Sequence, residues 1–261
     1  MSLSLVLLGS GSSGNATLVS DGDTHILVDV GLSGKETERR LAECGLTPQQ
    51  ISAIVVSHEH GDHCRGIGPF AKHLKVPVFI TDGAYAASGL VIDESRRQRI
   101  ESGRAFDVHG VVFTPFAVPH DAADPIAFRI EKSGVRIAIV LDLGYVSNLV
   151  AERLKGCDGI VLESNHDIRM LKVGPYPWAL KQRVMSRRGH LSNDGVSEYL
   201  TNGFDGKASH LVLAHLSEKN NLPDLAMLSA QRALEERSSL VSLQTRLDVA
   251  RPDRVSARYR F

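Results

Sequence analysis

Residues 57–64 read SHEHGDHC and come directly after a short apolar run, residues 53–56, that predicts a buried strand. Within this segment, side chains of the kind that bind zinc, manganese or iron are carried by His58, His60, Asp62 and His63. In an extended segment His58 and His60 point the same way, whereas Asp62 and His63 begin the next predicted helix and point elsewhere. One segment can therefore serve two neighbouring metal ions. The alternatives are a solvated polar turn and a lone structural metal.

The opening LLGSGSSGN, residues 7–15, contains the pattern G-x-G-x-x-G at Gly9, Gly11 and Gly14. That pattern indicates dinucleotide binding only when a strand enters it and a helix leaves it. Here the following residues 16–28 read as two short strands around a tight turn, with no helical period. We therefore predict a glycine-serine loop between strands rather than a dinucleotide site.

The charge balance is even, with 30 Lys and Arg against 30 Asp and Glu among 261 residues. Because the formal net charge is zero, the protein as a whole does not attract a polyanion, and any nucleic-acid site must be a local basic patch. The three cysteines, Cys44, Cys64 and Cys157, form no C-x-x-C pair and fit a reducing cytosol. The run Leu5 to Leu8 is too short for a signal peptide, and no stretch approaches the ~18 apolar residues of a membrane span. We expect a cytoplasmic protein without a membrane segment.

Strand-like and helical segments alternate along the chain, which indicates a layered α/β architecture. The predicted strands cover residues 6–10, 17–20, 25–30, 53–57, 76–81, 111–118, 125–132, 136–144, 159–164 and 210–217, with two more near 240–248 and 254–260. Helices are predicted at 35–44, after Asp62, at 176–188, 193–202 and 223–237, and residues 83–105 are polar and helix-prone. The helix at 35–44 has a capping box, Ser33 with Glu36, and Gly45 as its stop.

The motif HEHGDH resembles the signature of the metallo-β-lactamase superfamily. Further acidic residues and histidines follow strands in the order typical of that family: Asp29 in LVDVG, His120 in AVPHD, Asp142 in IVLDLG and His215 in VLAHLS. The resemblance covers essentially the whole chain. It implies a four-layer αββα sandwich, with two mixed sheets flanked by helices, in which residues 1–261 form a single domain of two packed halves without a β-CASP-type insertion.

The same resemblance implies a dinuclear site. It assigns His58, His60 and His120 to one metal, Asp62, His63 and His215 to the other, and Asp142 to a bridging position. Asp29 would be a partner of a ligand or of the bridging water, the alternative being a turn aspartate. Two divalent ions, zinc or manganese and as a further option iron, would lower the pKa of a shared water to roughly 7. We expect Asp62 and Asp29 to hold the resulting hydroxide for attack on an anionic substrate.

Three segments resemble the WalJ/YycJ group of small metallo-β-lactamase-fold DNA exonucleases: LDLGYVS at 141–147, LESNHD at 162–167 and the stretch 173–200. The resemblance implies a phosphodiesterase that acts on DNA ends through a metal-bridging hydroxide. The absence of a cysteine near Asp142 argues against an antibiotic hydrolase. A glyoxalase II-like thioester hydrolase, an RNA-directed nuclease of the same fold and a non-enzymatic nucleic-acid-binding protein remain alternatives.

Candidate substrate contacts lie in the second half of the chain. Ser192 or Asn193 can cap a helix whose free N–H groups would receive a phosphate, and His190 is a candidate phosphate contact or leaving-group acid. This region also has basic and aromatic side chains that could contact the phosphates and bases of a single strand. They are Arg187 and Arg188, with the neighbours Lys181, Arg183, Tyr176 and Trp178. A structural histidine and a solvated helix face are the alternatives.

Other polar residues are expected around the site. Ser12, Ser13 and Asn15 of the glycine-serine loop are candidate substrate contacts. Glu163 and His166 follow a strand and either orient metal ligands or form a buried structural pair. The expected partner is a nucleic acid, DNA before RNA, with no membrane; a homodimer is not excluded.

Overall fold

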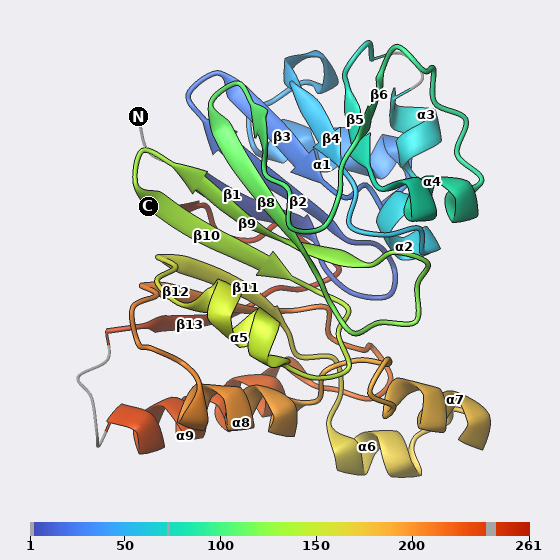
Figure 1. Ribbon diagram of the computed structural model, residues 1–261. Helices are drawn as coiled ribbons and strands as arrows, with labels where there is room; N and C mark the ends of the chain where they lie inside the picture. Colours follow the sequence, from blue (N-terminus) through green and yellow to red (C-terminus); the bar gives the residue numbers. More distant parts are fainter. Residues whose placement is uncertain (1–2, 72–73, 239–243) are drawn as a thin grey trace.

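The computed structural model describes residues 3–71, 74–238 and 244–261. Within these ranges two sheets, each of seven strands, pack face to face, and helices cover their outer faces (Figure 1). The predicted fold class, an αββα sandwich, is confirmed. The predicted helix at 193–202 matches the structure residue for residue, and the glycine-serine loop leads into a strand as expected.

Sheet A has the order β14-β1-β2-β3-β4-β5-β6. Its strands are β1 (Ser4–Gly9), β2 (Ala16–Asp21), β3 (Thr24–Val28), β4 (Ala53–Val55), β5 (Val78–Ile80), β6 (Arg97–Arg99) and β14 (Tyr259–Arg260). β1, β2 and β3 are antiparallel, whereas β3 to β6 run parallel. The carboxyl ends of β3 and β4 therefore meet at one edge of the sheet.

Sheet B has the order β13-β12-β11-β10-β9-β8-β7. Its strands are β7 (Phe106–Val108), β8 (Val111–Ala117), β9 (Ile126–Lys132), β10 (Val135–Val140), β11 (Gly159–Glu163), β12 (His210–Ala214) and β13 (Arg246–Val249). β7 to β10 form an antiparallel meander, and β10 to β13 run parallel. Loops after β10, β11 and β12 consequently leave the sheet at a common edge.

Helices flank both sheets. They are α1 (Gly34–Glu43), α2 (Gly61–Cys64), α3 (Ile67–Ala71), α4 (Asp82–Ser88), α5 (Asn148–Leu154), α6 (Ile168–Val173), α7 (Trp178–Val184), α8 (Asn193–Asn202) and α9 (Pro223–Ser238), with a 3₁₀ turn at Pro48–Gln50. Figure 1 shows α1, α3 and α4 beside sheet A and α5, α8 and α9 beside sheet B, with α6 and α7 near the edge where β10 to β12 end.

Three apolar layers hold the sandwich together. The middle layer joins the inner faces of the two sheets, with Val55 of sheet A and Phe113 and Phe128 of sheet B among its buried side chains. The outer layers pack α1 and α3 on sheet A, for example through Leu41, and α8 and α9 on sheet B, for example through Leu200. Because polar groups at strand ends lie outside these layers, the sheet edges are where chemistry can be placed.

The structure corrects several predicted elements. The helix-prone region 83–105 holds only the short α4 and then β6, because the residues between them form an irregular loop. β7, α5 and α6 were not predicted, and each has seven residues or fewer. Residues 239–243 of the predicted strand near 240–248 lie outside the described residues; its described part is β13. No helix in the described ranges is long and apolar enough to cross a membrane.

Candidate metal centre

The candidate site residues stand at the carboxyl ends of strands. Asp29 follows β3, the SHEHGDHC segment follows β4, and Asp142 and His215 follow β10 and β12. Asp29, Asp142 and His215 have positive φ values of 61°, 53° and 55°. Non-glycine residues seldom adopt this left-handed conformation, and such residues gather at functional sites. The backbone thus turns sharply at three strand ends and aims polar side chains at one place.

Two groups of candidate ligands form there. One consists of His58, His60 and His120, and the other of Asp62, His63 and His215; within each group the ligand atoms lie within 4.8 Å of one another. His120 Nε2 is 3.2 Å from His60 Nδ1, and His215 Nε2 is 3.2 Å from an Asp62 oxygen. The structure therefore brings together the six side chains that the resemblance divided between two metals.

Asp142 lies between the two groups and is buried. Its Oδ2 is 2.6 Å from His63 Nε2 in the second group and 3.9 Å from His58 Nε2 in the first. Its Oδ1 is 3.9 Å from His120 Nε2. A carboxylate in this position can serve a cation in either group.

Four of the candidate ligand histidines have a polar partner at Nδ1. His58 Nδ1 is 2.9 Å from the Ser57 hydroxyl, and His120 Nδ1 is 3.0 Å from the carbonyl oxygen of Gly189, to which it donates. His63 Nδ1 and His215 Nδ1 lie 2.8 Å and 2.7 Å from carboxylate oxygens of Asp29 and Glu163. Metal-binding histidines commonly have such a partner on the other nitrogen, because it fixes the tautomer and ring orientation.

The donor chemistry fits divalent cations. Among the buried side-chain atoms of the described ranges, His58 Nε2 has no hydrogen-bond partner, although it faces the other candidate ligands. Burial, and then the neighbouring His63, holds the pKa of His58 well below its ordinary value. Burial opposes charge on Asp142 as well, but His215 and His63 outweigh it and hold the pKa of this carboxyl well below its usual range. An unprotonated imidazole beside an ionised carboxylate is the state that binds a metal.

Glu163, at the end of β11, is a fully buried anchor for this arrangement. Its Oε1 accepts from His190 Nδ1 at 2.8 Å and from His215 Nδ1 at 2.7 Å. Its Oε2 accepts the backbone N–H groups of Leu143 and Leu191 at 2.9 Å and 3.0 Å. Burial opposes ionisation of Glu163, but His190 and its hydrogen bonds lower the pKa to about 2. The carboxylate therefore positions His190 and His215 and braces the turn after Asp142.

Asp29 contacts a candidate ligand and the backbone beside it. Its Oδ1 accepts from Ser57 N–H and its Oδ2 from the Ser57 hydroxyl, both at 2.8 Å, while Oδ2 also contacts His63 Nδ1. Asp29 does not line the pocket beside the candidate ligands. Because both oxygens are engaged by Ser57 and His63, the geometry favours the first of the two expected roles, a partner that orients the ligand His63, over contact with the bridging water.

The glycine-serine loop borders the site, and its members differ in role. Ser12 lines the pocket, whereas Ser13 is exposed and its carbonyl oxygen accepts from Arg65. Asn15 is buried, and its amide lies 3.3 Å from Asp62 Oδ2 and 3.0 Å from His63 Nε2. Asn15 therefore positions candidate ligands rather than facing substrate. Ser10 was not singled out from the sequence, yet its hydroxyl accepts the backbone N–H of His215 at 2.7 Å.

A cavity of about 310 Å³ opens beside the candidate ligands. Its lining includes the candidate ligands His60, Asp62, Asp142 and His215, together with His190 and Asp121, and α7 supplies Leu180, Arg183 and Val184. Among the described lining residues Arg183 is the one lysine or arginine. Its Nε donates to Asp121, and its two Nη groups make no hydrogen bond in the described ranges.

Arg187 and Arg188 do not line this cavity. The Arg187 guanidinium lies 4.4 Å above the ring of Tyr145, and Arg188 Nε donates to the His120 carbonyl oxygen at 3.1 Å. The start of α8 also lies outside the cavity. The Ser192 hydroxyl caps α8, and Asn193 is buried in hydrogen bonds with Ser164 and Asn221. These contacts correct the expectation that Asn193 binds substrate, because its side chain is occupied within the fold.

The fold and the site define a metal-dependent hydrolase. The sequence matches the beta-lactamase superfamily domain over residues 24–216, and the chain belongs to this superfamily. A solved structure of similar architecture is the metallo-β-lactamase-fold protein YhfI from Bacillus subtilis, with a TM-score of 0.75, 15% identity and full coverage of both chains.

Sequence relatives point to a narrower group. The chain is 35% identical to exodeoxyribonuclease YycJ of Bacillus anthracis over 240 residues, which is 91% of each protein. It is 32% identical to exodeoxyribonuclease WalJ of Streptococcus pneumoniae over 252 residues, which is 95% of this chain and 94% of the relative. The resemblance identified from the motifs is therefore confirmed along almost the whole chain.

Metal loading is expected to stabilise the native protein, because the ligand groups come together only in the fold. At zinc concentrations 100 times the Kd, the gain is about 2.7 kcal/mol, which corresponds to a Tm increase of about 5–10 °C for a chain of this size. Calorimetry with and without a chelator measures the shift. Asp142→Asn should reduce both the shift and the metal content found by emission spectrometry. A metal-free protein with an unchanged Tm after zinc addition would contradict the assignment.

Glu163→Gln is expected to weaken metal affinity by about 10- to 100-fold, as for other partners of ligand histidines. The amide replaces one acceptor oxygen by a donor, so it cannot accept all four hydrogen bonds that Glu163 accepts. Competition with a chromophoric chelator measures the affinity. Glu152→Gln, the same change at an exposed residue paired with Lys155, is the matched control. Equal affinities in both variants would show that Glu163 does not support the site.

Proposed function

We propose that this hydrolase is a dinuclear metal-dependent phosphodiesterase, and specifically an exonuclease that acts on DNA ends. The observation that carries the proposal is the convergence of both ligand groups, shared around Asp142, on one cavity that also contains His190 and Arg183. The similarity to two proteins named exodeoxyribonucleases supports DNA as the substrate. The three free thiols fit the expected cytoplasmic setting.

The proposed ligand sets are His58, His60 and His120 for one ion and Asp62, His63 and His215 for the other, with Asp142 between them. Zinc and manganese both suit imidazole and carboxylate donors. Bound divalent ions would neutralise phosphate charge and make a water molecule acidic enough to act as a nucleophile near neutral pH.

His190 is the proposed acid for the leaving oxygen. Its Nδ1 contacts Glu163 Oε1 at 2.8 Å and Asp142 Oδ1 at 3.1 Å, and its side chain is 22% exposed at the cavity. Burial opposes protonation, but Glu163 and Asp142 outweigh it and raise the pKa of His190 well above its ordinary value. With Nδ1 held by carboxylates, Nε2–H is the group left to donate a proton to the leaving oxygen.

Arg183 is the proposed phosphate contact within the cavity. Asp121 holds its Nε, which leaves the planar Nη fork free of protein partners. This fork matches two oxygens of a phosphate group. Such a cation suits the phosphate of a phosphodiester, but it also suits the carboxylates of a glutathione thioester, so cleavage assays on both substrates separate the two functions.

The proposal is tested with end-labelled single-stranded and duplex DNA and RNA, incubated with manganese-loaded or zinc-loaded protein. We expect stepwise shortening of DNA from one end, and a loss of more than about 100-fold in rate in His60→Ala and Asp142→Asn, because both alter proposed ligands. Absence of DNA cleavage by protein shown to carry two ions would overturn the proposal. Hydrolysis of a glutathione thioester by the same sample would favour the alternative.

Arg183→Ala is expected to raise KM for an oligonucleotide by about 10- to 100-fold, the effect of losing hydrogen bonds to a charged group. Its kcat should change less, and Arg183→Lys should restore part of the affinity, because lysine keeps the charge without the fork. Steady-state kinetics on a 12-mer measures the split. An unchanged KM in Arg183→Ala would exclude Arg183 as a substrate contact.

A further inference from the structure

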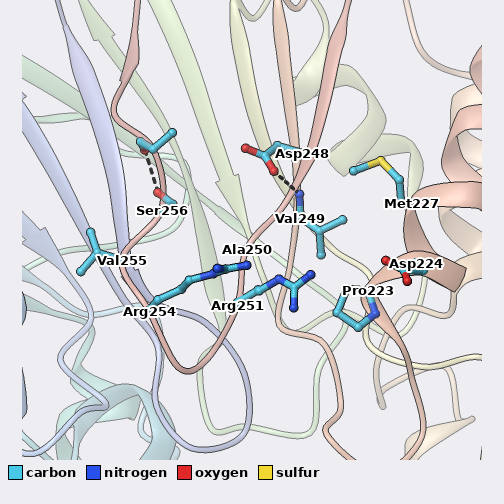
Figure 2. Close-up of a pocket in the computed structure, with 11 residues that line it drawn as sticks. Pro223, Asp224, Met227, Asp248, Val249, Ala250, Arg251, Arg254, Val255 and Ser256 are labelled. Carbon is cyan, nitrogen blue, oxygen red and sulfur yellow. Dashed lines mark hydrogen bonds between the residues drawn. The ribbon is translucent and has the colours of Figure 1, made fainter.

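A second cavity, also of about 310 Å³, lies between the start of α9, the end of β13 and the segment after it (Figure 2). Its polar lining includes Arg251 and Arg254, and its apolar lining includes Pro223, Val249 and Val255. Figure 2 shows both arginine side chains lying across the cavity, with Arg251 extending toward Pro223 and Asp224. None of these residues belongs to the metal centre described above.

The two guanidinium groups have no partner among the residues that the structure describes. In the described ranges neither Arg251 nor Arg254 makes a side-chain hydrogen bond or an ion pair. The backbone beside them is nevertheless fixed: Ala250 N–H donates to the Leu213 carbonyl at 2.8 Å, and Ser256 N–H donates to the Leu7 carbonyl at 2.9 Å. Two sets of five N–H donors are therefore presented from an anchored loop without anything to bind within the chain.

Two lining carboxylates, Asp224 and Asp248, balance the formal charge of the two arginines, but neither forms an ion pair with them within the described residues. Asp248 accepts from Val249 N–H at 2.8 Å through one oxygen and from the Tyr259 hydroxyl at 2.6 Å through the other. Asp224, in the first turn of α9, is the lining carboxylate that has no hydrogen bond in the described ranges. The lining therefore carries no formal net charge, and what it offers an anion is two guanidinium groups whose N–H donors have no partner within the described residues.

The loop that carries the two arginines contacts the glycine-serine loop, which borders the metal-site cavity. β13 pairs in parallel with β12, with Val249 opposite Leu213, so Arg251 and His215 leave neighbouring strands at the same edge. A Cβ atom built on Gly11 would lie 3.5 Å from Pro252 Cβ, which places the glycine-serine loop against the arginine loop. Ser12, the next residue, lines the metal-site cavity. The loop that carries Ser12 therefore contacts the loop that carries both arginines.

We propose that Arg251 and Arg254 form a second anion site, which binds a backbone phosphate of the DNA strand at a nucleotide outside the metal-site cavity. This inference rests on the proposed nuclease function. The guanidinium groups bind the phosphate oxygens, and Pro223, Val249 and Val255 supply apolar surface for the adjoining deoxyribose or base. A strand held at this second site remains bound while its end is cleaved, so affinity depends on strand length.

The double variant Arg251→Ala/Arg254→Ala tests the site. KM for a single-stranded 12-mer should rise by about 10-fold or more, whereas KM for a dinucleotide with one phosphodiester should not change. The slope of log affinity against log salt should fall in magnitude by about 0.7, because the loss of one phosphate contact on a single strand removes about that much. Asp224→Asn should lower KM for the 12-mer, since it removes the opposing charge.

The matched control is Lys207→Ala/Arg246→Ala, which removes two positive charges at the opposite ends of β12 and β13. It should leave both KM values and the salt slope as in the parent protein. Circular dichroism verifies that each variant is folded. An Arg251/Arg254 variant that matches this control on the 12-mer would overturn the second anion site.

Direct binding separates this inference from the nuclease proposal. Fluorescence anisotropy of a labelled 12-mer is measured in a His60→Ala background, where cleavage does not contribute. If the parent protein cleaves no DNA but the arginine substitutions weaken this binding, the anion site stands and the nuclease function falls. If DNA is cleaved and binding is unaffected by the substitutions, the nuclease function stands and the anion site falls.

Discussion

The constraint on which the site depends is the burial of an ionised carboxylate among imidazoles. Asp142 is removed from water, and its negative charge is tolerable only because His63, His215 and His190 surround it within about the length of a hydrogen bond. Each of these rings needs its own support, which comes from Asp29 behind His63 and from Glu163 behind His190 and His215. A divalent cation would take over the compensating role of positive charge. The polar side chains at the sheet edge therefore form a connected network, and a substitution of one member alters the hydrogen bonds of its neighbours.

The sandwich provides the positions for this network. Parallel strands in both sheets end at one edge, and the apolar layers on either side of the sheets keep that edge fixed. α7 then closes one side of the cavity, and the ion pair between Arg183 and Asp121 ties this helix to the loop that carries His120. The proposed phosphate contact and the candidate metal ligands thus come from elements far apart in sequence that the two sheets hold together.

The sequence predicted the fold class. It also identified six ligand candidates and Asp142, because histidine and aspartate directly after predicted strands form a distinctive pattern. It could not assign roles that depend on orientation. Asp29 and Glu163 each follow a strand, and only their contacts show that both stand behind histidines. Four basic residues lie between positions 181 and 188, yet only Arg183 of these four lines the cavity. The direction of each side chain depends on its position around the helix and on contacts such as the stacking of Arg187 on Tyr145, which the sequence does not show. Short elements such as β6 and β7 carry too few residues for a periodic signal.

The left-handed backbone at Asp29, Asp142 and His215 carries a cost for the fold itself. Aspartate and histidine tolerate this conformation better than most residues, but in each the Cβ atom makes it less favourable than it would be for glycine. Residues that support chemistry therefore work against stability at the same positions. Substitutions that increase the stability of the fold would therefore be favoured at these three turns. They would remove the side chains of the site while the sandwich remained intact.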